Sequence, residues 1–379
     1  MNILIISADF PPWDGGIAQV AYEYARAFTG LGHQVTALAP IYGDDKAWDG
    51  RQPFEVLRYR CHKSFQGHYW LLRLKLAKLL RRRIYDWILC MRWNFDGLAL
   101  GARIRGNPVI FQWFHGNELF DRHLAKPKWS HRLADLMHRT HANIAVSDFT
   151  ADLLARHYPA CPRVHTVRLG IDSRRFTPPA SVEEAKAALG WQGRRVILSL
   201  ARLVQRKGQE LVIRSLPHLK AYRDILYVIA GKGAYEKNLR DLAAELGLAE
   251  QVRFVGFVPE SRKVHYFQAC DIYTMPSKSA AKLGDVEGFG LTFLEANACG
   301  KPVIGGRQGG CMEAIADGIS GLLVDPDSDH DMAAALERLL RDEAFYKKLA
   351  RQGLERARQE FSWEASCRNL LGLHESCAR

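Results

Sequence analysis

Two glutamates flank a glycine-containing turn in the segment 285–306, a pattern that suits the binding of a phosphate. Glu287 and Glu295 lie eight positions apart, on either side of a Gly-Phe-Gly turn at 288–290. An apolar, helix-permissive segment follows, and then a short β-like run at 302–304. Such a turn exposes backbone N–H groups at a helix N-terminus, where a phosphate is held well. The segment therefore predicts an anion site with carboxylates beside it.

Two cations in another loop fit the same chemistry. Arg202 and Lys207 lie five positions apart in the loop 201–208, directly after a predicted strand. A guanidinium can clamp a diphosphate with two hydrogen bonds, and an ammonium acts as a mobile point charge. Gly231 and Gly233 follow the next predicted strand. Several strand-end loops with cations or backbone donors favour an anion site, although either cation alone would fit an ordinary surface charge.

The first half of the chain offers its own candidates. Gly15 and Gly16 follow a predicted strand and let the backbone come close to a ligand, but they do not complete a GxGxxG motif. A structural tight turn is the alternative. His115 follows the predicted strand 109–114 and precedes Gly-Asn-Glu at 116–118. That position is the expected ligand side of a parallel sheet. A purely structural histidine is the alternative there.

The positions of these residues imply two βαβ series. Apolar runs and helical periodicity alternate along the chain, which is typical of α/β domains with a parallel sheet. We place the boundary between two doubly wound domains at 175/176 and expect a last helix, from about 361 to 379, to cross back onto the first domain. The predicted strands are 2–7, 34–38, 87–90, 109–114, 143–146, 195–200, 225–230 and 252–254, and the predicted helices include 18–31, 209–219 and 235–246.

The overall composition excludes several classes of protein. The 379 residues are 47 % hydrophobic and 25 % charged, as in ordinary globular proteins. No apolar run approaches the roughly 18–20 residues of a membrane span, and the N-terminus lacks the basic start of a signal peptide. The eight cysteines form no CxxC pair, which argues against a zinc site and for reduced thiols. We expect a cytoplasmic protein.

Positive charge is concentrated in the first half of the chain. Residues 1–170 hold 23 Lys and Arg against 14 Asp and Glu, and the whole chain has a net charge of +12. The segment 69–83 contains six of these basic residues together with Trp70 and several leucines. It predicts an amphipathic helix that can lie on the anionic inner face of a membrane. An ordinary helix with a solvated basic face is the alternative, and no nucleic-acid-binding motif is evident.

Taken together, these motifs resemble the retaining, nucleotide-sugar-dependent glycosyltransferases of family 4. The resemblance rests on Arg202-x4-Lys207-Gly, Gly231-x-Gly233 and Glu287-Gly-Phe-Gly with Glu295. It covers the whole chain and is strongest over 195–325. The branch it most resembles contains the bacterial phosphatidylinositol mannoside mannosyltransferases. It implies a GT-B fold, in which two Rossmann-like domains face one another across a cleft where donor and acceptor meet.

The resemblance implies catalytic roles for four side chains. His115 would contact the transferring sugar through its 6-hydroxyl, and Glu287 would hold other sugar hydroxyls. Arg202 and Lys207 would neutralise the diphosphate leaving group, which is the expected largest contribution to catalysis. No metal or other cofactor would be needed. The donor phosphate oxygen would help to deprotonate the acceptor in a same-face substitution, so the two glutamates are not the acid pair of a glycoside hydrolase.

The resemblance also implies a donor-binding set. Glu295 would accept hydrogen bonds from the nucleotide ribose, and the loop containing Val258 would meet the base. The alternatives are a surface position for Glu295 and a helix-capping role for Glu287. The remaining predicted donor-binding positions are Gly15, Gly16, Gly231, Gly233, Gly288, Phe289, Gly290 and Leu291.

The sequence thus predicts a hexosyltransferase, with mannose favoured, that uses a GDP- or UDP-sugar. Its acceptor would be a glycan or lipid-linked precursor of a cell-envelope polysaccharide or glycolipid. A sugar-nucleotide epimerase or an α-glucan synthase would use the same two-domain plan. A non-catalytic nucleotide-sugar-binding protein is the alternative from another class, and the intact set of charged residues argues against it.

Overall fold

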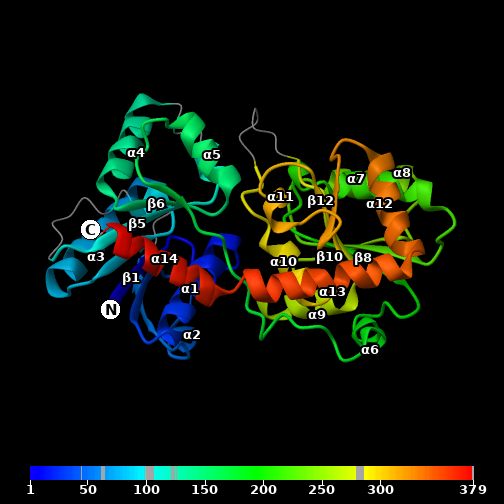
Figure 1. The fold of residues 1–379 in the computed structure, drawn as a ribbon, viewed down its shortest axis with the longest axis horizontal. Coiled ribbons are helices and arrows are strands. Elements are labelled where there is room, and N and C mark those ends of the chain that lie inside the picture. The colour runs from blue at the N-terminus through cyan, green and yellow to red at the C-terminus, as the bar shows by residue number, and fades with distance from the viewer. Residues whose placement is uncertain are drawn as a thin grey trace. The chain divides into compact units, whose positions relative to one another are not determined.

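The chain forms two compact units in the computed structural model (Figure 1). The first unit comprises Met1–Gly170 and Trp363–Arg379, and the second comprises Ile171–Ser362. The unit boundaries therefore fall at 170/171 and 362/363. The structure describes residues 1–43, 45–60, 65–97, 99, 106–120, 124, 126–278 and 286–377. Residue 285, at the start of the segment 285–306, and the last two residues of the predicted final helix lie outside these ranges.

The first unit is built on a seven-stranded parallel sheet with the order β3-β2-β1-β4-β5-β6-β7. Strand order reverses between β1 and β4, as in doubly wound α/β folds. The expected strands at 87–90 and 109–114 are confirmed with the same bounds. The strands are β1 (Asn2–Ile6), β2 (Gln34–Pro40), β3 (Glu55–Tyr59), β4 (Trp87–Cys90), β5 (Val109–Phe114), β6 (Ala142–Ala145) and β7 (Val164–Thr166).

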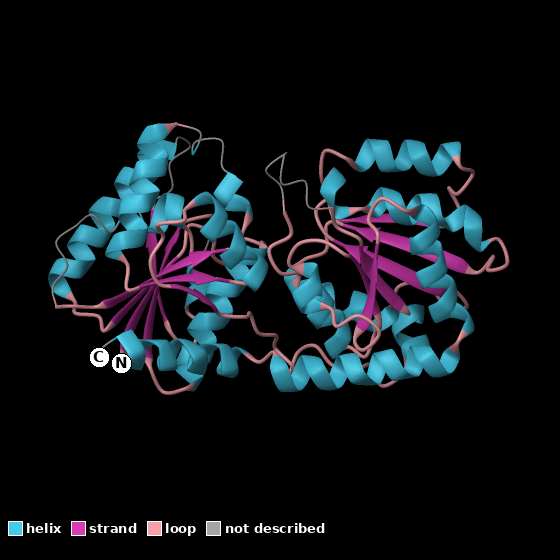
Figure 2. Ribbon diagram, turned by 45° about the horizontal axis from the view of Figure 1, so that its top comes forward, coloured by secondary structure: helices cyan, strands magenta, loops and turns pink. Residues whose placement is uncertain are grey.

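Helices flank both faces of this sheet (Figure 2). These helices lie in the connections between parallel strands. Such a connection must carry the chain back to the starting end of the sheet, which a tight hairpin turn cannot do. The helical elements are α1 (Gly16–Gly30), α2 (Lys46–Asp49), α3 (Phe65–Arg82), the π-helical turn η1 (Trp93–Gly97), η2 (Asn117–Phe120), α4 (Pro127–Arg139) and α5 (Asp148–His157).

The second unit repeats this architecture with a six-stranded parallel sheet in the order β10-β9-β8-β11-β12-β13. The expected strands at 195–200 and 225–230 are again confirmed. Its strands are β8 (Arg195–Leu200), β9 (Ile225–Ala230), β10 (Val252–Gly256), β11 (Ile272–Met275), β12 (Val303–Gly306) and β13 (Gly321–Val324). Its helical elements are α6 (Val182–Ala187), η4 (Gln205–Lys207), α7 (Gln209–Ser215), η5 (Leu216–Leu219), α8 (Glu236–Glu245), η6 (Glu260–Arg262), α9 (Lys263–Ala269), α10 (Leu291–Ala298), α11 (Cys311–Ala314), α12 (Asp329–Arg341) and α13 (Glu343–Glu360).

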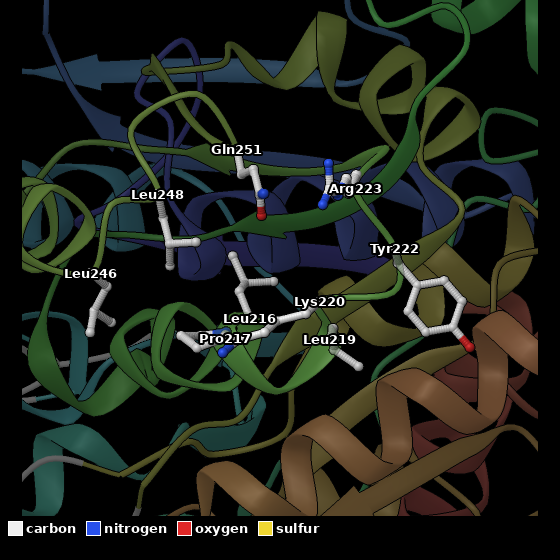
Figure 3. A pocket seen from close by; sticks show the side chains of 9 residues that line it. All are labelled: Leu216, Pro217, Leu219, Lys220, Tyr222, Arg223, Leu246, Leu248 and Gln251. Carbon is white, nitrogen blue, oxygen red and sulfur yellow. The ribbon is translucent and has the colours of Figure 1, made fainter.

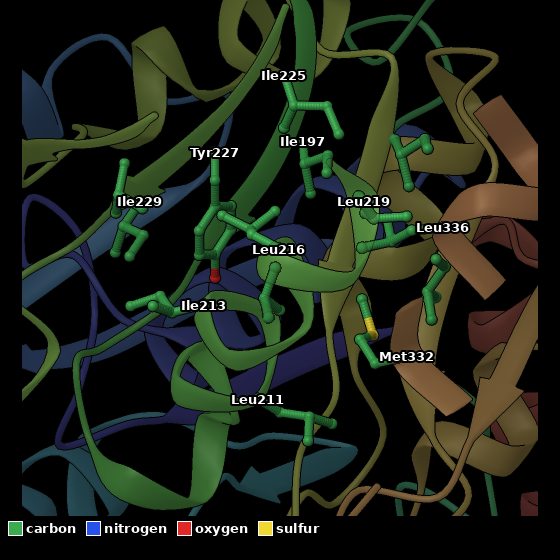
Figure 4. Packing of buried hydrophobic residues seen from close by; sticks show 14 of the residues in the cluster. Ile197, Leu211, Ile213, Leu216, Leu219, Ile225, Tyr227, Ile229, Met332 and Leu336 are labelled. Atoms are coloured by element: carbon green, nitrogen blue, oxygen red, sulfur yellow. The ribbon is translucent and has the colours of Figure 1, made fainter. Parts of the chain in front are cut away.

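A continuous apolar core holds the helices of the second unit on its sheet (Figure 4). Ile197, Tyr227 and Ile229 project from β8 and β9, and their side chains are fully or almost fully buried. Leu216 of η5 and Met332 of α12 pack in the same cluster. Burial of this apolar surface holds the strands in place. Each loop begins where a buried strand ends, so the position at which the loop starts is fixed as well.

The last helix, α14 (Trp363–Cys377), belongs to the first unit, where it packs beside α1 (Figure 1). The indole of Trp363 meets the ring of Tyr24 edge-on at a centroid distance of 5.1 Å. The hydroxyl groups of Tyr24 and Ser366 lie 2.5 Å apart, and Oγ of Ser366 also donates to the carbonyl of Arg168. These contacts tie the end of the chain to its beginning.

Within the described residues, none of the helices combines the length and the apolar character needed to span a bilayer. The free thiols among them, at positions 90, 161, 270, 299, 311 and 367, are mostly buried. Both findings concern only the part of the chain that the structure describes.

Candidate active site

Loops at the carboxyl ends of the strands in the second unit bring Glu287 against two cations. Its Oε2 atom lies 2.5 Å from Nζ of Lys207 and 3.0 Å from Nη1 of Arg206. The side chains of Glu287, Lys207 and Arg206 are 14 %, 11 % and 6 % exposed. Water screens charges little at this depth, so the three groups hold one another in place. We refer to them as the Glu287 cluster.

Burial and charge oppose each other in setting the pKa values of this cluster. Burial raises the pKa of Glu287, but Lys207 and Arg206 together lower it more, and the pKa lies below its ordinary value. Burial lowers the pKa of Lys207, and the attraction of Glu287 offsets only part of that effect. Glu287 is therefore a carboxylate at neutral pH. An ionised carboxylate accepts hydrogen bonds and cannot donate one, which suits it to hold sugar hydroxyls.

The sequence identified Lys207 in this cluster but missed Arg206. The turn η4 points Arg206 inward, where it reaches Glu287, whereas Arg202 is exposed. The carbonyl oxygen of Arg202 accepts a hydrogen bond from Nε2 of Gln209 at 3.3 Å. Spacing could not separate the two arginines, because both lie in one short loop and only the η4 turn decides which of them is buried.

The turn at 288–290 is held tightly against the loop that contains Gly310. The N–H of Gly310 donates to the carbonyl of Glu287 at 2.8 Å. A Cβ atom on Gly310 would lie 2.1 Å from the carbonyl oxygen of Gly288, so only glycine fits there. Gly290 has a φ of 93° and precedes Leu291, the first residue of α10. The first N–H groups of this helix have no partner within it and can meet an anion.

Glu295 lies in a second buried network of charges. Its Oε1 atom accepts a hydrogen bond from Nζ of Lys263 at 3.0 Å, and Lys263 also contacts Glu260 at 3.1 Å. Arg175 pairs with Glu260 at 2.9 Å. Burial raises the pKa of Glu295 above its ordinary value although Lys263 opposes that effect. The Oε2 atom is buried, lies near Lys263 and makes no hydrogen bond within the described residues.

Gly231 and Gly233 allow two loops of the second unit to pack closely. Cβ atoms at these positions would lie 1.9 Å from the carbonyl oxygen of Ala201 and 2.1 Å from that of Leu203. The N–H of Leu203 donates to the carbonyl of Lys232 at 3.0 Å. The glycines therefore have a packing reason of their own, and their contact with a donor stays a prediction.

Val258 follows β10 and is buried, whereas its neighbour Phe257 is half exposed. The sequence predicted that this loop meets the nucleotide base. Phe257, in the middle of this predicted loop, presents an aromatic ring to solvent at the carboxyl end of β10, and the contact with a base stays a prediction.

In the first unit, His115 directly follows β5 and is held by two hydrogen bonds. Its Nε2 atom donates to the carbonyl of Met91 at 3.0 Å, and its backbone N–H donates to the carboxylate of Glu118. Burial lowers the pKa of His115, although the charge of Glu118 partly counters this effect. The ring is therefore neutral at pH 7, with its proton on Nε2 and Nδ1 left as the acceptor. A neutral imidazole of this kind can accept a hydrogen bond from a sugar hydroxyl.

Gly15 and Gly16 are exposed at the start of α1, in a loop that side chains hold in place. Arg58 donates to the carbonyl of Pro11 at 2.6 Å. The exposed indole of Trp13 stacks on Tyr42 at a centroid distance of 5.4 Å. No motif in the sequence had indicated this aromatic pair. A Cβ atom on Gly15 would lie 3.7 Å from Nε1 of Trp13, so the indole lies beside this glycine.

A small surface pocket of about 160 Å³ lies elsewhere in the second unit (Figure 3). Leu216, Leu219 and Leu248 supply its apolar wall, and Lys220 and Arg223 supply its charges. No predicted site residue lines it, so it plays no part in the chemistry of the Glu287 cluster.

Comparison with known proteins decides the family. A model described as glycosyl transferases group 1 matches residues 181–356, and one described as glycosyltransferase family 4 matches residues 14–175. A GDP-mannose-dependent α-(1-6)-phosphatidylinositol monomannoside mannosyltransferase of Mycolicibacterium smegmatis is 30 % identical over 353 residues, covering 90 % of this chain and 89 % of the relative. This chain is a glycosyltransferase of family 4. The family expected from the motifs is thus confirmed.

Further similar proteins include another relative in sequence and two solved structures. A D-inositol 3-phosphate glycosyltransferase of Thermobifida fusca is 34 % identical over 243 residues, covering 61 % of this chain and 54 % of the relative. Among solved structures, HepE of Anabaena in complex with UDP and glucose matches with a TM-score of 0.82 at 20 % identity, covering 99 % of this chain and 100 % of that one. Sucrose-phosphate synthase of Thermosynechococcus elongatus matches with a TM-score of 0.83 at 22 % identity, covering 99 % of this chain and 98 % of that one. These likenesses confirm the GT-B fold of the glycosyltransferase.

Proposed function

We propose that this glycosyltransferase moves a mannosyl residue from GDP-mannose to a lipid-linked acceptor of the cell envelope, with retention of anomeric configuration and without a metal ion. The observation that carries the proposal is the buried Glu287 cluster beside the 288–290 turn. It combines a carboxylate for sugar hydroxyls with cations for a diphosphate. The choice of mannose and of a glycolipid rests on the mycobacterial relative.

Lys207 and Arg206 would stabilise the leaving group, and the role predicted for Arg202 at the diphosphate stays a prediction. Cleavage of the sugar–phosphate bond places negative charge on the departing diphosphate and positive charge on the sugar. Cations fixed before the reaction stabilise such developing charge without reorganisation, which is commonly the largest contribution to catalysis. The ion pairs with Glu287 fix both cations in advance. Two fixed cations and the N-terminus of α10 would do the work that a metal ion does in other transferases.

Glu287 and Glu295 would bind different parts of the donor, the sugar and the ribose. Glu287 is an ionised acceptor, as hydrogen bonds from sugar hydroxyls require. Glu295 has a buried oxygen atom, Oε2, that lies 3.0 Å from Nζ of Lys263 and makes no hydrogen bond inside the described residues. A carboxylate oxygen can accept more than one hydrogen bond, and a ribose hydroxyl can donate one. His115, neutral with Nδ1 as an acceptor, would take the 6-hydroxyl of the sugar.

A donor panel tests the proposal. We expect GDP-mannose and GDP to raise the melting temperature in the presence of EDTA, since a ligand at one hundred times its Kd adds about 2.7 kcal/mol to stability. UDP-glucose serves as the matched competitor. A panel in which only UDP-sugars protect the chain would overturn the choice of donor, and protection by no nucleotide sugar would overturn the donor site itself.

Assays of mannosyl transfer test the proposed retention of configuration and the proposed independence of a metal ion. We expect the anomeric signal of the product, followed by NMR, to match the configuration of the donor. The rate with phosphatidylinositol mannoside as acceptor should be the same in EDTA and in Mg²⁺. An inverted product or loss of activity in EDTA would contradict the proposed mechanism.

We also propose that α3 binds the inner face of a membrane peripherally. Trp70 and Leu74 lie one turn apart on this helix and are 56 % and 65 % exposed. The next turns on the same side carry Lys78, Arg81 and Arg82, which are exposed as well. Exposed apolar groups next to cations are what an interfacial helix presents to anionic lipid. Arg83 is ion-paired with Glu55 and is not needed for this argument.

Vesicle co-sedimentation tests this placement. The Trp70→Ser, Leu74→Ser double variant should bind vesicles that contain anionic phosphatidylglycerol several-fold more weakly than the parent chain. Vesicles of phosphatidylcholine alone should bind both proteins poorly. Equal binding of the variant and the parent to anionic vesicles would rule out α3 as the membrane contact.

A further inference from the structure

A cluster of two histidines and a carboxylate lies in the second unit, apart from the residues of the proposed donor site. His218 belongs to the turn η5, and Asp329 and His330 begin α12. One potential ligand atom from each of the three residues lies within 4.8 Å of the other two. His218 Nε2 donates to Oδ2 of Asp329 at 3.4 Å, and the two imidazole rings lie 4.2 Å apart between centroids.

These distances suit a transition metal ion. A tetrahedral zinc site with metal–ligand distances of about 2.0–2.1 Å places its ligand atoms roughly 3.4 Å from one another. The contact between His218 and Asp329 already has this length. His218 and His330 are exposed, so small rotations of their side chains can bring in the third ligand without repacking the core. Two imidazoles and one carboxylate favour Zn²⁺ and similar ions over Mg²⁺ or Ca²⁺.

The scaffold that carries these ligands is fixed by the core. Leu216 and Leu219 of η5 pack in the same buried cluster as Met332 and Leu336 of α12 (Figure 4). His218 lies between the two leucines in sequence, and Asp329 lies one turn before Met332. The buried residues therefore hold the two segments at a set spacing, which is the main requirement for a site built on rigid elements.

The carboxylate is also oriented in advance. Oδ1 of Asp329 accepts a hydrogen bond from the backbone N–H of His330 at 3.0 Å, which leaves Oδ2 on the side of His218. Although burial would raise it, His218 and His330 together hold the pKa of Asp329 below its ordinary value. Partners of this kind, which fix the direction of a ligand, are typical of protein metal sites.

We propose that His218, Asp329 and His330 bind a divalent transition metal ion, with Zn²⁺ as the representative ion, and that the ion links η5 to α12. Three protein ligands leave at least one position for water. The site is separate from the Glu287 cluster, and the proposed transfer reaction does not use it. Its effect would be on the stability of the second unit, because an ion that binds only the folded chain stabilises it.

Titration of the untagged chain with ZnCl₂, followed by calorimetry, tests this proposal. We expect one tight site in the parent chain, and about a ten-fold or greater loss of affinity in each of His218→Ala and His330→Ala. His265→Ala removes another exposed histidine and should bind as the parent does. MgCl₂ should give no comparable binding. Equal binding by the parent and the His218→Ala, His330→Ala double variant would overturn the proposal.

Thermal unfolding supplies a second readout. Zn²⁺ at one hundred times its Kd should raise the unfolding midpoint of the parent chain by about 5–10 °C. The double variant should unfold at the parent's temperature without the ion and should not respond to it. A parent chain that binds no Zn²⁺ in the millimolar range, or that gains no stability from it, would contradict the assignment.

Discussion

At the scale of single residues, Glu287 holds its cluster together because it balances two cations. Removing the acid leaves Lys207 and Arg206 facing one another in a largely buried place, whereas removing Lys207 leaves Glu287 paired with Arg206. An uncompensated buried charge costs about 3–5 kcal/mol. The two substitutions should therefore differ in stability, although both remove one member of the same ion pair.

Glu287→Gln should accordingly lower the free energy of unfolding by about 3 kcal/mol, and Lys207→Met by clearly less. Urea unfolding of the two variants and the parent measures the difference. Arg202→Met removes an exposed cation of the same loop and should change stability by no more than about 0.5 kcal/mol. Equal losses of unfolding free energy in Glu287→Gln and Lys207→Met would show that the buried charge of Arg206 does not need Glu287 as its partner.

His115 should make stability depend on pH. Burial holds its pKa below the ordinary value of 6.5. As the pH falls below 6.5, His115 takes up a proton in the unfolded chain but stays neutral in the folded chain. The free energy of unfolding therefore falls. The contribution of His115 is fully present above 6.5 and is lost as the pH decreases towards the folded pKa.

Comparison of the parent with His115→Gln isolates this effect. Between pH 7 and pH 5.5 the parent should lose more stability than the variant, by up to about 1.4 kcal/mol per pH unit. Other buried histidines contribute equally to both proteins and cancel. A stability difference that does not change with pH would mean that His115 titrates in the folded chain as it does in a peptide.

At the scale of elements, the glycines of the second unit decide how closely its loops approach. Gly310→Ala would place a methyl group 2.1 Å from the carbonyl oxygen of Gly288. Either this loop or the turn at 288–290 must move, and Glu287 moves with the turn. Overpacking of this kind costs about 1–3 kcal/mol.

We therefore expect Gly310→Ala to reduce transfer at least about ten-fold, because a displacement of about 1 Å in a positioned site has effects of that order or larger. Gly30→Ala is the control: nothing lies within 4 Å of its added methyl group, so activity and stability should be retained. Full activity in Gly310→Ala would show that the turn tolerates a shift.

Most of the fold could be predicted from local patterns, and the rest depended on distant contacts. Largely apolar runs such as Val109–Phe114 and Ile225–Ala230 predicted their strands with correct bounds, because buried parallel strands are nearly continuous in apolar residues. The strand β3 was missed because Glu55–Tyr59 lies at the sheet edge, is only partly buried and lacks such a run. No local pattern in the sequence predicts the π-helical turn η1.

The candidate site was predictable only in part for the same reason. The motif gave Lys207 and Glu287, and the structure places them in contact across 80 positions of sequence. Arg206 was not predicted, because its inward direction depends on the η4 turn. Lys263 was missed because it lies 32 positions before Glu295 and carries no motif of its own. The predicted contacts of Glu295 and Gly231 with a donor stay predictions.

At the scale of the whole molecule, the chain passes from one unit to the other twice, at 170/171 and at 362/363. The second passage ends in α14, which the first unit buries through Trp363 and Ser366. Because α14 contributes side chains to the core of the first unit, that unit needs both ends of the chain. The final helix is therefore a structural part of the first unit.

Trp363→Ala should lower the free energy of unfolding by about 3–5 kcal/mol, as expected for a buried tryptophan. Trp70→Ala removes an indole that is 56 % exposed and should cost less than about 1 kcal/mol. Denaturant unfolding followed by circular dichroism measures both. Similar, small losses in the two variants would mean that α14 is not needed for a stable first unit.

The measurement that tests the proposed donor site most directly compares GDP binding with mannosyl transfer in Glu287→Gln and Lys207→Met, in EDTA and at a temperature where both variants are folded. We predict that Lys207→Met weakens GDP binding at least about ten-fold, because it loses a diphosphate cation. Glu287→Gln should bind GDP nearly as the parent does but transfer mannose about one hundred-fold more slowly, a loss of roughly 2.7 kcal/mol of transition-state stabilisation. Parental transfer rates in Glu287→Gln, or parental GDP affinity in Lys207→Met, would contradict the assignment of the Glu287 cluster as the donor site.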